Sequence, residues 1–300
     1  MQEIEFKFQV PVKKRKALQK AFTLLKAEPI HLAAQYFDTA DQTLAKHCIA
    51  IRRRQENGEW KQTFKAVNTA KALSRFELEF DIAPPETTTL DLDNYKKDYS
   101  AIYKKLKRAL GLPLPTLELL FETNIQRLRV LQDVGNSTVE IALDIGKIFE
   151  EQNSVDIFEI EFELKQGSIE DLIAFIRPWV QKYQLSLDTH SKSDYGLLAV
   201  RQQSSFSAQY QTPLVLNRSS SEVEALQSIV ANCLQHLLPN ASSIARQQYS
   251  SEHVHQARVA IRRLRTALKS FAAWSEAIQP HWKAELTTIF QALGGTRDID

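Results

Sequence analysis

Charged and apolar residues alternate from the start of the chain, where Glu3, Glu5 and Lys7 are separated by Ile4 and Phe6. In an extended strand, side chains two positions apart lie on the same face. The alternation returns at Arg52/Arg54, Lys61/Thr63/Lys65, Arg75/Glu77/Glu79, Arg127/Arg129, Glu140/Ala142/Asp144 and Glu159/Glu161/Glu163. Together these faces carry basic and acidic residues at regular, alternating positions. The pattern therefore favours a β-barrel with a polar interior over a sheet with one solvated face.

Residues 1–200 are predicted to form strands interrupted by a few helices, an α+β arrangement. Asn57-Gly58 predicts a tight hairpin between two alternating segments. Ser168 is a good N-cap for the last helix of this region. The strands are expected at 2–10, 33–38, 48–55, 59–66, 74–82, 117–132, 138–149 and 155–165, and the helices at 12–27, 94–110 and 168–184.

Residues 201–217 are polar and are predicted to be a linker between this region and an all-α segment at 218–300. Helices are expected at 222–238, 252–274 and 280–293. In the second of these, apolar residues recur every three or four positions from Val254 to Phe271, which is typical of an amphipathic helix packed along one seam.

The bulk composition is typical of a globular protein, with 43% hydrophobic and 25% charged residues and a net charge of +2. Cys48 and Cys233 are the two cysteines, and their separation argues against a disulfide scaffold or a zinc site. No signal peptide and no apolar run of roughly 20 residues is found. We therefore expect a cytoplasmic protein without a membrane partner.

Carboxylates on two separate strands predict a site for a hard divalent cation. If the strand with Glu3 and Glu5 lies beside the strand of Glu159, Glu161 and Glu163, several carboxylates converge. Mg²⁺ and Mn²⁺ prefer such oxygen-rich sites, and Asp144 could add a further oxygen ligand. For a single pair of glutamates, a solvated acidic face without a metal is the alternative.

Basic residues at alternating positions predict an anion in the same interior. Arginine forks and lysine ammonium groups suit phosphate oxygens, and clustered inward cations repel one another unless an anion neutralises them. A chain of phosphates has the required charge density. Arg53 lies between Arg52 and Arg54 and is expected to point to the opposite face.

These motifs together resemble the CYTH family of triphosphate tunnel metalloenzymes. The matching segments, in chain order, are Glu3 to Lys7 (ExExK), Tyr36 to Thr39, Ile51 to Arg54, Thr63 to Lys65, Arg75 to Glu79 (RxExE), Val139 to Gly146, Glu159 to Glu163 and Ser191-Lys192. The resemblance implies an eight-stranded antiparallel tunnel with flanking helices that cleaves a linear triphosphate with Mg²⁺ or Mn²⁺, two ions per site.

The resemblance also implies roles for individual residues. The metal ligands would be Glu3, Glu5, Glu159, Glu161 and Glu163. The groups that bind triphosphate would be Lys7, Arg52, Arg54, Lys65, Arg75, Arg127, Arg129 and Lys192, and those that take part in catalysis Lys65, Glu77, Glu79 and Asp144. The segment at Tyr195-Gly196 is expected to form a helix that plugs or gates the tunnel.

A basic stripe in the C-terminal segment comprises His255, Arg258, Arg262, Arg265 and Lys269. A solvated basic face and a nucleic-acid surface are alternatives, but the aromatic residues expected of single-strand binders are missing. His255 to Arg265 and the Arg297-Asp298 segment resemble the first part of a CHAD domain. That resemblance implies polyphosphate binding through the stripe.

The expected activity is hydrolysis of inorganic triphosphate, because a CHAD-like segment favours a polyphosphate-related substrate. A thiamine triphosphatase and a class IV-type adenylate cyclase are alternatives in the same tunnel. A base-recognition pocket would distinguish them, and none is readable in the sequence. The third alternative is a non-catalytic polyphosphate-binding module, against which the intact acidic strands argue.

Overall fold

The computed structural model describes residues 2–67, 75–87, 89–90, 92, 95–96, 99–151 and 153–294, without the side chains of Gln2, Glu3, Val67 and Arg75. The chain divides into two compact units, one made of residues 1–69, 73–186 and 190–203 and the other of residues 70–72, 187–189 and 204–300. Within the described residues, no helix combines the length and the apolar character needed to cross a lipid bilayer.

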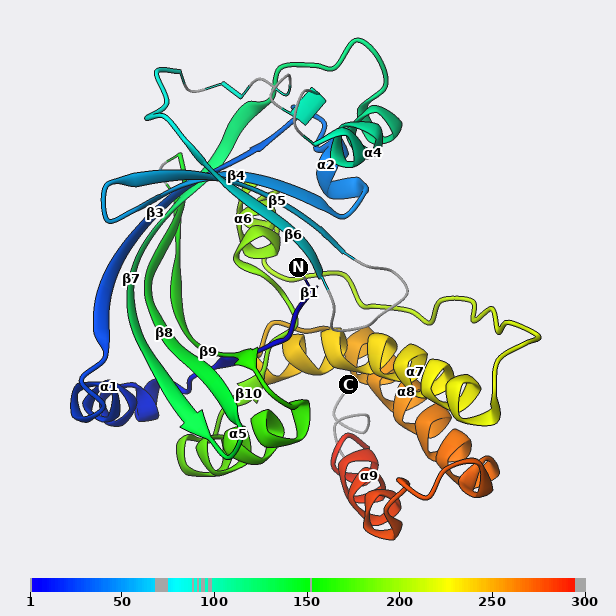
Figure 1. Cartoon of the computed structure of the whole chain (residues 1–300). Helices are drawn as coiled ribbons and strands as arrows, with labels where there is room; N and C mark the ends of the chain where they lie inside the picture. The colour runs from blue at the N-terminus through cyan, green and yellow to red at the C-terminus, as the bar shows by residue number, and fades with distance from the viewer. Residues whose placement is uncertain are drawn as a thin grey trace. The chain divides into compact units, whose positions relative to one another are not determined.

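One antiparallel sheet forms the first unit and curls around an interior into which helix α6 (Lys192–Val200) projects (Figure 1). Its order is β1-β6-β5-β4-β3-β7-β8-β9-β2-β10. The strands are β1 (Gln2–Glu3), β2 (Glu5–Gln9), β3 (Glu28–Asp38), β4 (Ile49–Glu56), β5 (Glu59–Val67), β6 (Arg75–Ile82), β7 (Glu118–Val134), β8 (Ser137–Glu150), β9 (Asn153–Gln166) and β10 (Ser186–Leu187).

The long strands β2 to β9 correspond to the eight predicted from the sequence, whereas β1 and β10 have two residues each. The N-terminal segment breaks at Ile4. It pairs with β6 through β1 and with β9 through β2, so it contacts both ends of the run of strands from β6 to β9. The tunnel fold is confirmed. The hydrogen-bonded order, however, is that of a curled open sheet with β1 and β10 at its ends.

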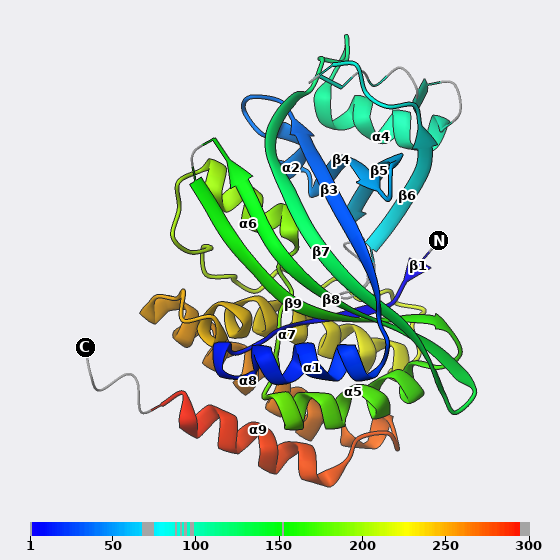
Figure 2. The same cartoon turned by 90° about the vertical axis from the view of Figure 1, so that its left-hand side faces the viewer.

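Helices pack on the outer face of the sheet, as the alternating pattern requires (Figure 2). Behind β4 and β5, Ile51 and Phe64 are fully buried in a core with Leu44 of α2 (Thr43–Lys46) and Leu106 of α4 (Ser100–Leu110). The polar side chains of the same strands consequently face the interior.

A second apolar layer covers the outer face of β9. Phe162 of this strand packs edge-on against Trp179 of α5 (Ile169–Tyr183), and Trp179 contacts Phe22 of α1 (Arg15–Leu24). A 3₁₀ turn, η1 (Val12–Lys14), precedes α1. The predicted N-cap of α5 is confirmed, because the Ser168 hydroxyl accepts a hydrogen bond from the Asp171 amide at 3.1 Å.

The hairpin between β4 and β5 turns at Asn57-Gly58 as predicted, with φ angles of +50° and +95°. These left-handed conformations fit the hairpin turns in which asparagine and glycine are favoured. Strand β3 begins at Glu28, five residues before the predicted start, although Pro29 has no amide hydrogen to donate. The register pairs Pro29 with Leu128 of β7, so β3 continues along its long neighbour.

Gly196 allows α6 to approach the sheet closely. A Cβ atom at this position would lie 2.2 Å from Cε2 of Phe121 in β7, and Phe121 is itself stacked on Tyr36 of β3 with ring centroids 4.5 Å apart. The aromatic pair therefore fixes how deeply α6 enters the interior.

Gly196→Ala is expected to destabilise the protein by roughly 1–3 kcal/mol, because overpacking forces either the Phe121 ring or α6 to move. Since α6 carries Lys192 at its first position, binding of ligands in the interior should weaken as well. Urea denaturation and ligand titration measure the two effects. Unchanged values for both would contradict the tight packing of α6.

The second unit is helical, with α7 (Glu222–Ala245), α8 (Ser251–Ser270), a 3₁₀ turn η2 (Ala272–Trp274) and α9 (Pro280–Ala292). Helix α7 continues seven residues past its predicted end, through Pro239. The side chain of Asn240 donates to the His236 carbonyl at 2.7 Å inside this helix and to the Gln209 carbonyl at 2.9 Å. Asn232 likewise donates to the Thr212 carbonyl at 3.1 Å, so both asparagines hold the segment that precedes α7.

Candidate active site

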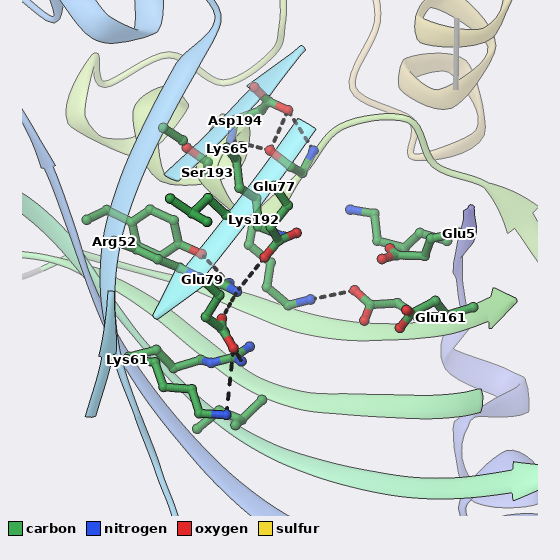
Figure 3. A pocket seen from close by; sticks show the side chains of 18 of the residues that line it. Glu5, Arg52, Lys61, Lys65, Glu77, Glu79, Glu161, Lys192, Ser193 and Asp194 are labelled. Atoms are coloured by element: carbon green, nitrogen blue, oxygen red, sulfur yellow. Dashed lines mark hydrogen bonds and ion pairs between the residues drawn. The ribbon is translucent and has the colours of Figure 1, made fainter. Parts of the chain in front are cut away.

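The interior of the sheet contains a cavity of about 860 Å³ lined mainly by charged side chains (Figure 3). Basic and acidic side chains are close to equal in number along its wall. The basic ones are Lys7, Arg52, Arg54, Lys61, Lys65, Arg127, Arg129, Lys165 and Lys192, and the acidic ones are Glu5, Glu56, Glu77, Glu79, Glu140, Glu161, Glu163 and Asp194. The interior is polar, as the alternation predicts.

Three carboxylates form a buried cluster on the wall built by β8 and β9, here called the acidic triad: Asp144, Glu159 and Glu161. Each offers an oxygen within 4.8 Å of the others, and Asp144 is fully buried. The register of β8 and β9 produces the cluster, because Asp144 pairs with Glu159 and Ala142 with Glu161. These positions lie on one face of neighbouring strands.

Three cations contact the acidic triad. Arg127 of β7 holds Asp144 with two hydrogen bonds, from Nε to Oδ1 at 2.6 Å and from Nη2 to Oδ2 at 2.7 Å, and it also donates to Glu161. Lys192 contacts all three carboxylates, with 2.7 Å to both Asp144 Oδ2 and Glu161 Oε1. Lys7 lies 3.3 Å from Glu159 Oε2.

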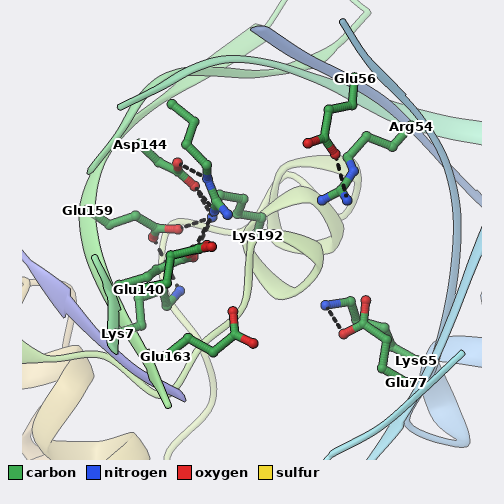
Figure 4. A network of polar contacts seen from close by, with 12 residues as sticks. Lys7, Arg54, Glu56, Lys65, Glu77, Glu140, Asp144, Glu159, Glu163 and Lys192 are labelled. Carbon is green, nitrogen blue, oxygen red and sulfur yellow. Dashed lines mark hydrogen bonds and ion pairs between the residues drawn. The ribbon is translucent and has the colours of Figure 1, made fainter. Parts of the chain in front are cut away.

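The opposite wall carries a second ion-pair cluster, formed by β4, β5 and β6 (Figure 4). Lys65 lies 2.6 Å from Glu77, and Arg54 lies 3.1 Å from Glu79. Lys61 and Glu56 extend this cluster through contacts of 3.7 Å to Glu79 and 3.2 Å to Arg54.

Arg52 is held less tightly than its neighbours on this wall. Its Nη2 atom lies 3.8 Å from Glu77 and 3.9 Å from Glu79, beyond hydrogen-bond distance. Its Nε atom donates to the Thr63 hydroxyl at 3.3 Å and its Nη1 atom to the Tyr36 hydroxyl at 3.5 Å. Arg52 is therefore a guanidinium aimed into the cavity with capacity for a further acceptor.

Asp144 and Glu161 stay ionised, although burial acts to raise the pKa of both carboxyls. Lys192 and Arg127 outweigh burial, so the pKa of Asp144 is lowered and that of Glu161 falls well below its usual range. Burial acts to lower the pKa of Lys192, but Asp144, Glu159 and Glu161 raise it well above normal. Asp144, Glu161 and Lys192 therefore keep their charges near neutral pH.

Glu5 behaves differently from the triad. Burial, followed by repulsion from Glu161, raises its pKa from 4.5 to about 7. Its carboxylate forms no hydrogen bond or ion pair with any side chain in the part of the chain that the structure describes. An uncompensated carboxylate next to the triad is a position at which a cation would be stabilising.

The donor set fits a hard divalent cation. The triad supplies three carboxylate oxygens that lie close together, and Glu5 adds a carboxylate that forms no ion pair with the described side chains. The predicted ligands Glu159 and Glu161 lie here together with Asp144. Glu163 lies apart, in an ion pair of 2.6 Å with Lys165.

Glu5→Gln is expected to raise the melting temperature of the metal-free protein by about 2–4 °C at pH 8 and by much less at pH 4.5. Because the folded-state pKa of Glu5 lies above its unfolded value, its contribution to stability falls as pH rises from 4.5 to about 7. A neutral amide avoids this loss. Thermal unfolding at both pH values measures the effect, and equal shifts at both would contradict it.

The structure does not describe the side chains of two predicted site residues, Glu3 and Arg75. Their backbones pair with each other between β1 and β6. Arg129 lies at the cavity rim in an exposed pair with Glu28 at 3.2 Å. Sequence reasoning did not assign site roles to Glu56, Lys61, Glu140 and Lys165. The alternation of the strands could have identified them, because each lies two positions from an assigned residue or within the same alternating set.

Three residues of the predicted basic stripe on α8, His255, Arg262 and Lys269, are exposed. Arg258 and Arg265 instead lie over the ring of Phe290 in α9, at 4.4 and 5.7 Å from its centroid. The predicted Arg297-Asp298 segment lies outside the described residues.

Comparison with known families explains this arrangement, since residues 1–194 match the CYTH domain. The chain belongs to the CYTH family. Residues 228–300 match the CHAD domain. The order of the two domains agrees with the resemblance drawn from the motifs.

This CYTH protein is 31% identical over 204 residues to an inorganic triphosphatase of Haemophilus influenzae. The match covers 66% of this chain and 55% of the relative, so the chain spans about half the length of that protein.

Solved structures to which this chain is similar include a Bacillus halodurans protein provisionally assigned as an adenylate cyclase. The identity is 20%, the TM-score is 0.44, and the match covers 64% of this chain and 96% of that chain. Another is a Hippeastrum protein, likewise provisionally assigned as an adenylyl cyclase and described as having a dominant triphosphatase activity, with 18% identity, a TM-score of 0.46 and coverage of 67% and 96%.

Proposed function

We propose that this CYTH protein hydrolyses inorganic triphosphate to diphosphate and phosphate in the cavity, with Mg²⁺ or Mn²⁺. The observation that carries the proposal is a buried acidic triad, of which Glu161 lines the cavity, with Arg52, Arg54 and Lys65 on the opposite wall. Membership of the CYTH family and the similarity to the Haemophilus influenzae inorganic triphosphatase support the same reaction.

The charge of the cavity supports a requirement for metal. A linear triphosphate carries about four to five negative charges near neutral pH, whereas the acidic and basic groups of the wall nearly cancel. The bare anion would therefore be poorly neutralised there. Two divalent cations would make the bound complex nearly neutral and match the wall.

The acidic triad and Glu5 would hold the metal. When bound, a divalent cation neutralises phosphate oxygens and increases the acidity of a water molecule. Arg52, Arg54 and Lys65 would bind the phosphate chain from the opposite wall, while Glu77 and Glu79 orient these cations through the ion pairs described above. In the reaction, a bridging P–O bond breaks as a water oxygen bonds to phosphorus, and the water protons leave to solvent.

The lining favours an inorganic substrate over a nucleotide or a thiamine ester. Among the described lining residues, Tyr36 is the one aromatic side chain, and its ring is already stacked on Phe121. A base or thiazole ring would therefore find no free stacking partner on this wall.

Phosphate release from inorganic triphosphate, ATP and thiamine triphosphate, each with Mg²⁺, Mn²⁺ or EDTA, tests the proposal. We expect rapid release from inorganic triphosphate alone, lost in EDTA. A faster reaction with ATP or thiamine triphosphate would replace the proposed substrate. Binding of triphosphate without release from any of the three would replace the enzyme by a binding module.

For the CHAD segment we propose polyphosphate binding through the exposed residues His255, Arg262 and Lys269 of α8. Contacts of this kind are electrostatic and salt-dependent. Replacing all three by glutamine should weaken polyphosphate binding at least tenfold in a titration at low salt. An unchanged affinity would leave the stripe as a solvated face.

A further inference from the structure

Lys192 occupies the position at which the acidic triad would hold a cation. Its ammonium lies 2.7 Å from Asp144 Oδ2, 2.7 Å from Glu161 Oε1 and in contact with Glu159. Figure 4 shows it reaching the triad from α6, on the far side of the cavity from Lys65 and Glu77. A divalent cation bridging the same oxygens cannot coexist with this ammonium, because like charges at such short distances repel strongly.

We propose that Lys192 is an internal counter-ion that holds the metal position in the ligand-free protein and leaves it when phosphate binds. Phosphate oxygens in the cavity would draw the ammonium away from the triad, and the divalent cation would then take the vacated oxygens. The second step rests on the proposed function, since it assumes that a triphosphate enters this cavity.

Lys192 is better suited to such an exchange than the other cations at the triad. It has a flexible four-carbon stem and compact charge, and it lies at the first position of α6. Arg127 lies in the middle of β7, where a two-point contact with Asp144 fixes its planar fork. Lys7 also donates to the His190 carbonyl, which holds its ammonium beside Glu159.

The exchange makes a thermodynamic prediction. If triphosphate removes Lys192 from the triad, it raises the affinity for the divalent cation. By linkage, the cation raises the affinity for triphosphate by the same factor. Metal and triphosphate should therefore bind with positive cooperativity, and metal alone should bind weakly.

Mn²⁺ binding without any phosphate tests the counter-ion directly, by electron paramagnetic resonance of free Mn²⁺. We expect Lys192→Met to bind Mn²⁺ at least tenfold more tightly than the wild type. Lys61→Met is the matched control, because it removes the same charge from the same cavity but contacts Glu79 on the opposite wall. Its effect on Mn²⁺ affinity should stay within about threefold.

A non-hydrolysable triphosphate with bridging imido groups tests the coupling. In the wild type it should raise Mn²⁺ affinity at least tenfold, and in Lys192→Met by much less. Lys192→Arg keeps the charge and should retain weak Mn²⁺ binding in the absence of phosphate. A residue that only supports the fold would change the melting temperature without changing Mn²⁺ affinity.

Equal Mn²⁺ affinity of wild type and Lys192→Met would overturn the counter-ion, even in a protein that hydrolyses triphosphate. Absence of Mn²⁺ binding to Lys192→Met and to a second variant, Lys192→Gln, would overturn it as well. If the affinity change is found but no substrate is hydrolysed, the proposed function fails while the counter-ion stands. The two results are therefore distinguishable.

Discussion

Glu161→Gln is expected to lower phosphate release from inorganic triphosphate by at least about 1,000-fold. Glu161 contributes oxygens to the acidic triad and contacts both Arg127 and Lys192. The amide is nearly isosteric, but it offers one weakly basic oxygen where a divalent cation needs a charged ligand. Loss of a preorganised charge in a buried site typically costs factors of about 10²–10³, and loss of metal adds to it.

The fold should survive this substitution, because Arg127 and Lys192 both keep Asp144 as a partner. Circular dichroism and Mn²⁺ binding, measured beside the rate, separate loss of metal from loss of structure. Glu122→Gln is the matched control. Glu122 lies on the outer face of β7, where it accepts a hydrogen bond from Gln35 at 2.9 Å. A rate for Glu161→Gln close to that of this control would remove the triad from the mechanism.

The direction of each side chain on the long strands could be predicted from the sequence alone, because the period of two leaves little choice. Arg53 illustrates this. It was expected to face away from Arg52 and Arg54, and its guanidinium lies 5.2 Å from the ring centroid of Phe37 in the outer core. A strand with one apolar face must bury that face, which sends its charged neighbours inward.

Which of the predicted carboxylates converge in the acidic triad could not be predicted, because it depends on the register between strands. Asp144 was expected among the catalytic residues and named as an added oxygen ligand, and the alignment of β8 with β9 places it directly opposite Glu159. Glu163, on the same face of β9, pairs instead with Lys165. A sequence specifies which face a side chain takes, but the partner across the ladder follows from the whole sheet.

The boundaries of α7 show how a local signal can be overridden by packing. Pro239 indicates the end of a helix, and the predicted end was 238. The helix continues because its buried polar residues are engaged on both sides of the proline. Asn240 binds the His236 carbonyl within α7, and His236 is hydrogen-bonded to Gln256 of α8 at 2.8 Å. Such contacts between helices are not visible in a propensity pattern.

Arg52→Met is expected to raise the KM for inorganic triphosphate by about 30–150-fold, corresponding to the roughly 2–3 kcal/mol of a hydrogen bond to a charged group. Arg52 contacts Glu77 and Glu79 only at 3.8 and 3.9 Å. Its removal therefore leaves those carboxylates with Lys65 and Arg54, at 2.6 and 3.1 Å. A methionine fills similar volume, so the loss should fall on anion binding and not on stability. Steady-state kinetics with urea denaturation measures both.

Arg53→Met is the matched control, because neighbouring residues of β4 point to opposite faces of the sheet. It removes the same charge from the position next to Arg52. The Arg53 guanidinium packs over Phe37 and donates to the Thr87 carbonyl at 3.1 Å on the outer face. We expect a loss of stability of about 0.5–1 kcal/mol and an unchanged KM. If Arg53→Met raised KM as much as Arg52→Met, both guanidinium groups would attract triphosphate through the overall charge of the protein and not through a specific contact. The assignment of Arg52 to the phosphate-binding wall would then be wrong.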